Sequence, residues 1–534
     1  MKTKHFLSAA LLAMTTFAGS FAQQSYNCEG CPDLSTRPQK NLSTLTDVDG
    51  NLLAPTTLTC DTLWILDEKV YVTPGNPLTV LPGTVVKAVE SAGTGAAALI
   101  VTRDAKIYAN GSECCPIVFT TINDPLDGTY DIRTQKQWGG IILLGRAPNT
   151  VAQGEKNPEN GSFTIGDNTK GIGLIEGGDE GDSGHWYGSE VDLGEPFKIN
   201  DNSGILKYVS IRHGGSQLGT ANEINGLTLG SVGNGTTLRF IEVLSNYDDG
   251  IEFFGGTVDL KYARLLYMGD DNLDWDQGYV GRIQHVAGIY HTNITQTDAQ
   301  LGQSGMEIDG DDGTAFNREW LSNPIVANVT MIGSGINRAI RAKERTKGQI
   351  YNSIFANFDE GVELATGFDS LMVRYSSFYN MATDIDGTPV SGNASDGLPY
   401  APNGSGTNNE FGTSLLGLTT TDWSVSEPWD AVPTASPSAG AVDFSTVPLS
   451  DRQLAWFGSD YVTSFFDQVD YQGAYEPGAE VWWSQADCDI IGGAYTQNES
   501  FSSIVIATDV NNDGITNTLD LNAVVGRFGK LNNE

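Results

Sequence analysis

The sequence predicts an all-β protein that folds as a right-handed parallel β-helix, a solenoid in which the chain winds through stacked rungs. Glycine is frequent, with 63 residues, and short β-branched runs such as "LTVLPGTVVKAV" and "IVANVTMIGSG" recur along the chain. In six recurring segments an apolar residue precedes a charged one, and the charged residues are spaced by 22, 33, 34, 22 and 23 residues. Such a period is typical of repeats that stack into a coil.

The period has a physical basis, because one rung cannot bury both sides of its inward residues whereas a stack can. Parallel strands of successive rungs then pair about 4.8 Å apart. A closed sandwich or barrel is the alternative fold, and it would need hairpins at shorter spacing. The apolar column expected inside comprises Ile251, Leu273, Met306, Ile340, Val362 and Ile385. The charged column expected outside comprises Glu252, Asp274, Glu307, Arg341, Glu363 and Asp386.

Residues 1–22 form a predicted signal peptide at the start of the chain. Lys2 and Lys4 precede an apolar stretch from Phe6 to Phe21, and Ala22 ends it. This order is typical of a cleaved secretory signal. No later stretch approaches the roughly 18 uninterrupted apolar residues of a membrane span. The protein is therefore expected to be secreted, either extracellular or on the cell surface.

Residues 23–59 form a predicted N-terminal segment or cap that contains cysteines. The chain has six cysteines, an even number, so we expect disulfides in an oxidising compartment. Six cysteines allow fifteen pairings, and the sequence does not choose among them. A zinc site at the C-x-x-C pair is the alternative, although no second such pair accompanies it. The cysteines are Cys28, Cys31, Cys60, Cys114, Cys115 and Cys488.

Residues 60–480 form the predicted β-helix, with a loop-rich cap at 388–445 and a linker or strand at 481–508. Acidic residues outnumber basic ones by 66 to 30, which gives a net charge of −36. This balance excludes nucleic acid as a partner, because binding a polyanion needs a basic surface. Cations, or neutral and basic surfaces, are the expected partners; the alternative is that the charge serves only solubility in a salty exterior.

The densest group of acidic residues, which we call the acidic face, lies on the rungs between residues 248 and 309. Carboxylates about 5 Å apart repel by roughly 1 to 3 kcal/mol at effective dielectric constants of about 80 to 20. Repulsion of that size favours a bound cation or raised carboxyl pKa values. The acidic face comprises Asp248, Asp249, Glu252, Asp270, Asp271, Asp274, Asp276, Glu307 and Asp309.

The sequence leaves open whether the acidic face is catalytic. Glycoside hydrolysis needs two carboxyl groups about 5 to 9.5 Å apart, which neighbouring rungs can provide. A polysaccharide lyase would use calcium with Arg338 or Arg341 as the base. A structural or simple calcium-binding role is the alternative, and it favours a non-enzymatic scaffold that binds glycans or other cell-surface partners. The candidate catalytic residues are Asp249, Glu252, Asp271, Asp274, Asp276, Glu307 and Arg341.

Other residue types offer weaker signals for a site. The scattered histidines are expected to be surface or hydrogen-bonded residues rather than catalysts, and no hydrolase triad or metalloprotease motif is present. Aromatic residues could stack on sugar rings or fill the core. The histidines beyond the predicted signal peptide are His185, His213, His285 and His291, and the aromatic residues considered for stacking are Trp186, Tyr187, Trp275, Trp482 and Trp483.

Several stretches carry a resemblance to a known family. They include "LIVTRDAKIYANGSECCPIVFTT", "GILKYVSIRHGG" and "FFDQVDYQGAYEPG". Together they resemble a family of secreted right-handed parallel β-helix proteins common in Bacteroidota, over about residues 60–480. The resemblance implies a pectate-lyase-like coil, and it implies no established activity.

Residues 509–534 form a predicted calcium-binding module. In "DVNNDGITNTLD" oxygen ligands stand at positions 1, 3, 5, 7, 9 and 12, and Gly514 permits the turn at position 6. An Asn/Asp/Gly-rich surface turn is the alternative. The expected calcium ligands are Asp509, Asn511, Asp513, the backbone carbonyl of Ile515, Asn517 and Asp520.

The same segment resembles a dockerin type I calcium repeat, with "VVGRFG" after the loop. The resemblance implies calcium as a cofactor and an extracellular, often polysaccharide-associated setting. A full dockerin has two repeats and this segment has one, so docking to a cohesin-type partner is not expected.

Overall fold

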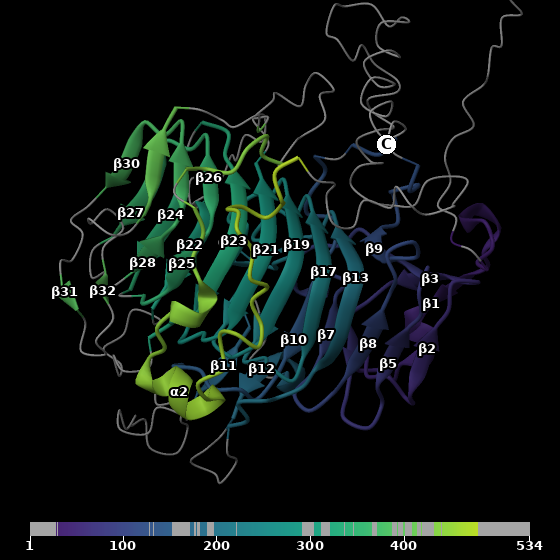
Figure 1. Ribbon diagram of the computed structural model, residues 1–534. Helices are drawn as coiled ribbons and strands as arrows, with labels where there is room; N and C mark the ends of the chain where they lie inside the picture. The colour runs from purple at the N-terminus through teal and green to yellow at the C-terminus, as the bar shows by residue number, and fades with distance from the viewer. Residues whose placement is uncertain are drawn as a thin grey trace, which may run out of the picture.

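The computed structural model confirms the parallel β-helix. It describes residues 28–478 with gaps, the longest of which are 152–170, 291–303, 311–320 and 419–431. Figure 1 shows the strands stacked side by side along one axis. The predicted signal peptide, the 481–508 linker and the 509–534 calcium module lie outside the described residues, as does most of the loop-rich cap at 388–445.

Two long parallel sheets form the walls of the coil. The first contains β1 (Gln39–Asn41), β2 (Thr56–Leu58), β3 (Leu63–Leu66), β5 (Leu78–Val80), β6 (Val85–Ala88), β8 (Ile107–Asn110), β9 (Ile117–Thr121), β13 (Gly204–Arg212), β17 (Thr237–Leu244), β19 (Asp259–Leu266), β21 (Arg282–Ile289), β23 (Ile325–Ile332), β25 (Gln349–Tyr351), β26 (Ile354–Ala356), β28 (Met372–Arg374), β29 (Ser377–Tyr379) and β33 (Glu410–Gly412). Its first strands fall within the segment 23–59, before the predicted start of the coil at residue 60.

The second sheet carries the predicted columns. Its strands pair in chain order, one for each rung: β4 (Val70–Val72), β7 (Leu99–Val101), β10 (Ile141–Leu144), β16 (Leu227–Gly230), β18 (Ile251–Phe254), β20 (Leu273–Asp276), β22 (Ser304–Asp309), β24 (Arg338–Lys343), β27 (Glu360–Leu364) and β30 (Thr383–Asp386).

The remaining described elements decorate the coil. Three antiparallel pairs are β11 (Ile172–Leu174) with β12 (Trp186–Gly188), β14 (Gln217–Gly219) with β15 (Asn222–Glu223), and β31 (Gly392–Asn393) with β32 (Pro399–Tyr400). Short 3-10 turns are η1 (Leu34–Thr36), η2 (Leu42–Leu45), η3 (Gly93–Gly95), η4 (Ser183–His185) and η8 (Phe444–Thr446), and one α-helix is α2 (Asp451–Phe457). No helix among the described residues is long and apolar enough to cross a membrane.

The core consists of stacked apolar columns, as predicted. Ile251 pairs in register with Leu273, Leu273 with Met306, Met306 with Ile340, Ile340 with Val362, and Val362 with Ile385. The side chains of the first five are fully buried in one core cluster. Because strand side chains alternate, the residue after each of them points out of the coil.

From β13 to β29 the first sheet bends in each rung at a residue with a positive φ. Aromatic rings stack on one another at this bend: Tyr208 lies 4.3 Å from Phe240, Phe240 4.7 Å from Tyr262, and Tyr262 5.0 Å from His285, measured between ring centroids. Their φ angles lie between 50° and 64°. Stacking offsets the strain that side chains other than glycine's meet in the left-handed region.

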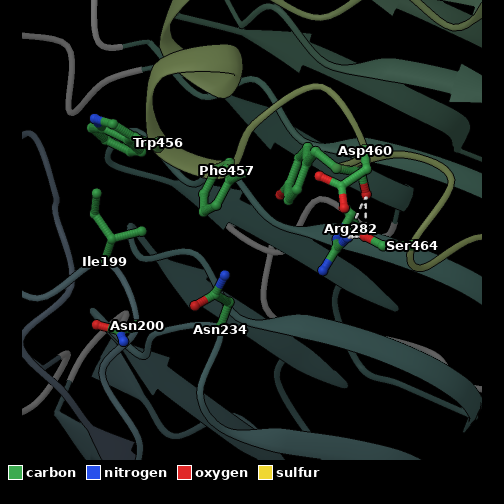
Figure 2. Close-up of a pocket in the computed structure, with 9 residues that line it drawn as sticks. Ile199, Asn200, Asn234, Arg282, Trp456, Phe457, Asp460 and Ser464 are labelled. Atoms are coloured by element: carbon green, nitrogen blue, oxygen red, sulfur yellow. Dashed lines mark hydrogen bonds between the residues drawn. The ribbon is translucent and has the colours of Figure 1, made fainter.

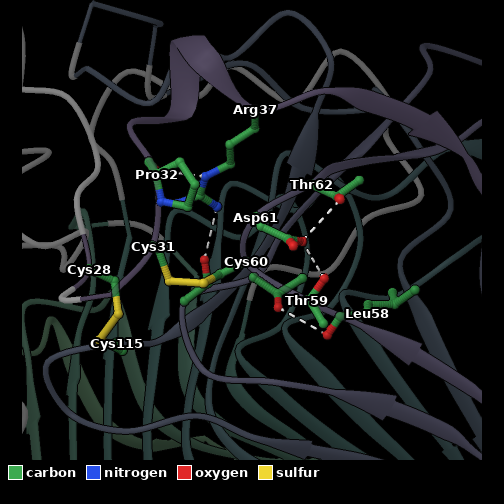
Figure 3. Close-up of a disulfide and its surroundings, with 12 residues drawn as sticks. Cys28, Cys31, Pro32, Arg37, Leu58, Thr59, Cys60, Asp61, Thr62 and Cys115 are labelled. Atoms are coloured by element: carbon green, nitrogen blue, oxygen red, sulfur yellow. Dashed lines mark hydrogen bonds between the residues drawn. A yellow bond between two sulfur atoms is a disulfide. The ribbon is translucent and has the colours of Figure 1, made fainter.

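Two disulfides fasten the N-terminal segment to the first rungs. Cys28 bonds to Cys115 and Cys31 to Cys60, and Figure 3 shows both beside Arg37, whose guanidinium donates to the carbonyls of Pro32 and Gly83. The C-x-x-C pair therefore forms disulfides and not the zinc site considered as the alternative. Cys488 lies outside the described residues.

A C-terminal strap, residues 461–475, runs back over the outer face of the first sheet. The Lys261 ammonium donates to the Phe465 carbonyl and pairs with Asp467 at 2.9 Å. Further along, the Ala474 amide donates to the Thr330 hydroxyl. These contacts place the strap over part of the first sheet. None of them involves the charged column on the second sheet.

Candidate functional site

The predicted charged column is in register along the second sheet. Glu252 on β18 pairs with Asp274 on β20, Asp274 with Glu307 on β22, and Glu307 with Arg341 on β24. Arg341 pairs with Glu363, and Glu363 with Asp386. Three carboxylates therefore follow one another on adjacent rungs, in the order that the sequence spacing predicted.

A ladder of side chains at the corner before these strands holds further carboxylates in place. The Asn225 side-chain oxygen accepts from the Asp249 amide at 3.2 Å, and an Asp249 carboxylate oxygen accepts from the Asp271 amide at 2.9 Å. Asp271 in turn accepts from the Ser304 amide. Each rung thereby fixes the corner of the next, and all four residues are at most 5% exposed.

Asn225 and Ser304 belong to this ladder although the sequence pattern did not predict them as site residues. The signal was available. Ser304, Asp249 and Asp271 stand two residues before members of the apolar column, in "SGM", "DGI" and "DNL", and Asn225 stands two residues before Leu227, in "NGL", which pairs in register with Ile251. These are residue types whose side chains bond to nearby backbone amides at turns.

Most of the acidic face gathers into three overlapping groups of carboxylates. In each group one oxygen from every member lies within 4.8 Å of the others. The Asp274 Oδ1 atom is buried without a hydrogen-bond partner. The groups are Asp248, Asp249 and Asp270; Asp249, Glu252 and Asp274; and Asp271, Asp274 and Glu307.

Burial and mutual repulsion raise the carboxyl pKa values in these groups. Burial is the larger cause for Asp249, Asp271 and Asp274, and the neighbouring carboxylates add to it. Burial also raises the pKa of Asp309 to about 7, although the Lys343 ammonium opposes the shift. Ionising several of these groups together is unfavourable unless a cation joins them.

The geometry and the donor set fit a calcium ion. Calcium takes oxygen ligands at about 2.3–2.6 Å, so two ligands on opposite sides of it lie about 5 Å apart. The 4.8 Å limit within each group is compatible with that span. Asp249, Glu252 and Asp274 would supply carboxylate oxygens, and Asp274 has one oxygen that no described residue satisfies.

Basic residues close one end of the acidic face. The Arg341 guanidinium lies 2.9 Å from Glu307 and 3.2 Å from Glu363, and Lys343 pairs with Glu307 and with Asp309. Burial alone would lower the pKa of Arg341, but the Glu307 and Glu363 carboxylates raise it. Arg338 also pairs with Glu363. Both arginines considered as lyase bases thus pair with carboxylates.

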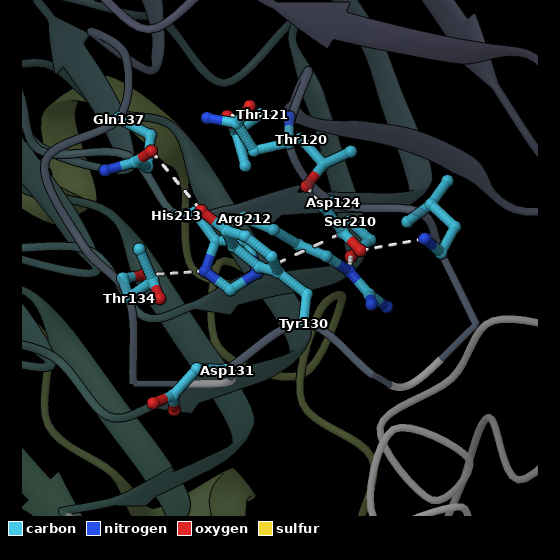
Figure 4. Close-up of polar contacts among 12 residues, drawn as sticks. Thr120, Thr121, Asp124, Tyr130, Asp131, Thr134, Gln137, Ser210, Arg212 and His213 are labelled. Atoms are coloured by element: carbon cyan, nitrogen blue, oxygen red, sulfur yellow. Dashed lines mark hydrogen bonds and ion pairs between the residues drawn. The ribbon is translucent and has the colours of Figure 1, made fainter.

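The described histidines are buried and hydrogen-bonded, as expected for residues that are not catalysts. Figure 4 shows His213 beside Tyr130 and Thr134. The His213 Nδ1 atom lies 2.6 Å from the Thr134 carbonyl oxygen. His285 contacts the Ala474 carbonyl, and His185 contacts the Tyr71 hydroxyl at 3.0 Å. Each is at most 3% exposed. His291 lies outside the described residues.

The aromatic residues singled out in the sequence are mainly core residues where the structure describes them. Trp275 and Tyr187 are fully buried, whereas Trp186 is partly exposed. Trp482 and Trp483 lie outside the described residues, as do all six predicted calcium ligands of the C-terminal loop.

Comparison with known proteins gives one match. A family model described as "pectate-lyase like beta helix domain" matches residues 50–173 and 189–396, more than half of the chain. The match spans every residue of the acidic face. No curated protein matches the chain.

Proposed function

Because the chain belongs to the family of the pectate-lyase-like beta helix domain, we propose that it binds acidic polysaccharide through calcium held on the acidic face. The carboxylate groups of three adjacent rungs, each set within 4.8 Å, carry this proposal. A divalent cation there would neutralise the protein's carboxylates and leave coordination positions for the carboxylates of a uronic-acid polymer. Because the rungs are spaced about 4.8 Å apart, ions on successive rungs would form a row along the coil, and one polysaccharide chain could bind along that row.

The proposed protein is a secreted or cell-surface scaffold that binds without cleaving. Two disulfides among the first rungs support an oxidising compartment. The ion pairs of Arg338 and Arg341 favour binding over lyase chemistry, because both guanidinium groups already serve carboxylates. A base must give up its proton, and the Glu307 and Glu363 carboxylates oppose that at Arg341 by raising its pKa.

The binding test uses the full chain on immobilised polygalacturonate. We expect calcium-dependent retention that EDTA abolishes, and a loss of at least about tenfold in affinity for the Asp271→Asn/Asp274→Asn variant, because each Asn removes a charged calcium ligand. Asp49→Asn, an exposed acidic position in the first rungs, is the control and should bind as the unaltered protein does. Equal retention with EDTA would refute the proposal.

Cleavage of polysaccharide is a second candidate function, favoured by one observation. The oxygens of Asp249, Glu252 and Asp274 lie within 4.8 Å, close to the separation of about 5 to 5.5 Å between the carboxyl groups of retaining glycosidases. Raised pKa values would keep one acid protonated beside an ionised one. Incubation with uronic-acid and neutral polysaccharides should then release reducing or unsaturated ends. Release that persists in Asp271→Asn/Asp274→Asn would place the activity elsewhere.

We also propose that calcium binds the C-terminal loop, on the ligand spacing of residues 509–520. Calorimetric titration of the full chain should show a class of site that disappears in Asp513→Ala, because this substitution removes a carboxylate ligand. Retention on polygalacturonate should not change. An identical titration for both proteins would contradict the loop assignment.

A further inference from the structure

A cavity of about 460 Å³ lies away from the acidic face, between α2 and the turns that precede β13 and β17. Figure 2 shows Trp456 and Phe457 of α2 on one side of an open space and Ile199, Asn200 and Asn234 on the other. The volume lies within the range of small-molecule sites, about 300 to 1,000 Å³. None of these residues belongs to the predicted columns.

Helix α2 is fixed firmly to the coil, so this wall of the cavity is preformed. The Ser450 hydroxyl accepts from the Gln453 amide, and the Gln453 side chain accepts from the Ser450 amide, which makes a capping box. The Gln453 side chain also donates to the Asn323 carbonyl at 2.9 Å. Gly458 ends the helix with a φ of 85°.

The charged groups at the cavity do not favour an anion. Arg282 lies in the wall, but its guanidinium pairs with Asp259 at 2.5 Å and donates to the Ser464 hydroxyl at 3.1 Å. Its face also packs 4.2 Å from the Tyr461 ring centroid. Asp460 adds an exposed carboxylate. The balance at the cavity is neutral to acidic, which disfavours uronate.

The remaining groups suit a ligand with one apolar face and many hydroxyls. The rings of Trp456 and Phe457 stand nearly perpendicular, at 85°, and Phe457 is backed by Tyr461 at 4.1 Å. The side-chain amides of Asn200 and Asn234 make no hydrogen bond to another described residue. An amide both donates and accepts, as a hydroxyl does, and an aromatic ring offers flat apolar surface.

We propose that this cavity binds a neutral pyranose residue, such as the end or a side branch of a glycan. The C–H face of the sugar packs on Trp456, and its hydroxyls bond to Asn200, Asn234 and the Asp460 carboxylate. The site needs no metal ion. It is therefore separate from the proposed calcium-dependent face, and either can hold if the other fails.

Titration calorimetry of the full chain in EDTA, against a panel of neutral mono- and disaccharides, tests the proposal. At least one sugar should bind with a Kd in the millimolar range, about 1 to 10 mM. Asn200→Ala/Asn234→Ala and, separately, Trp456→Ala should each weaken that binding by about tenfold or more. Leu454→Ala, which alters an exposed residue of the same helix outside the cavity, should bind normally.

Three results would overturn the proposal. They are the absence of binding by any neutral sugar, unchanged binding by the asparagine variant, and tighter binding of free galacturonate than of every neutral sugar. The asparagine variant keeps α2 intact, so it remains informative if Trp456→Ala fails to fold. Asp271→Asn/Asp274→Asn should retain sugar binding, which separates this site from the acidic face.

Discussion

Glu242→Ala is expected to lower the free energy of unfolding by about 3–5 kcal/mol, because it removes one partner of a buried ion pair. Glu242 and Arg212 are at most 1% exposed, and their oxygen and nitrogen lie 2.8 Å apart. The Ser210 hydroxyl donates to the same carboxylate oxygen at 2.6 Å. Arg264, also fully buried, occupies the next rung in register with Glu242. The substitution leaves the buried positive charge of Arg212 without the carboxylate that pairs with it.

Urea unfolding measures this loss through the midpoint and the slope of the transition. Asp49→Ala, at an exposed position, should change stability by no more than about 0.5 kcal/mol. Combining Arg212→Met with Glu242→Leu should recover part of the loss, since apolar pairs can replace buried ion pairs. A loss below about 1 kcal/mol for Glu242→Ala would show that the pair is not the buried contact described here.

Without calcium, Asp271→Asn/Asp274→Asn is expected to be more stable than the unaltered protein at pH 8. Burial and neighbouring carboxylates raise the folded-state pKa of both residues above the unfolded value. The folded state therefore binds more protons, so its stability falls as pH rises from the unfolded value of about 3.9 through the folded pKa. Asparagine removes this penalty, which is roughly 1 to 3 kcal/mol for each repelling pair.

Calcium should stabilise the unaltered protein more than the variant. A cation at 100 times its Kd stabilises the unaltered protein by about 2.7 kcal/mol, and the variant should gain little because it lacks two charged ligands. Thermal melts at pH 5 and pH 8, with calcium or EDTA, measure both effects. Melts in an Asp513→Ala background keep the C-terminal loop from contributing. An equal rise in Tm for both proteins on adding calcium would contradict a site on the acidic face.

The repeat made the coil and its charged column predictable from sequence. When a rung recurs after about 22 residues, equivalent positions meet the same neighbours above and below. Ile251 over Leu273, and Glu252 over Asp274, follow from that local rule. The six cysteines indicated disulfides, but the partners of Cys28 and Cys31 depended on how the first segment folds against the rungs.

The sequence by itself determined the β-helix and the presence of an acidic face. It also determined that the apolar column faces into the coil and the charged column faces out. Only the tertiary structure decided that Asn225 and Ser304 extend the corner ladder, that Arg341 is paired on both sides, and that Trp456 faces Asn234 across a cavity. The physical reason is the range of the contacts. Periodicity reports on contacts between adjacent rungs. Packing sets how a side chain turns at a corner and where a helix more than 200 residues along the chain docks, and packing leaves no period in the sequence.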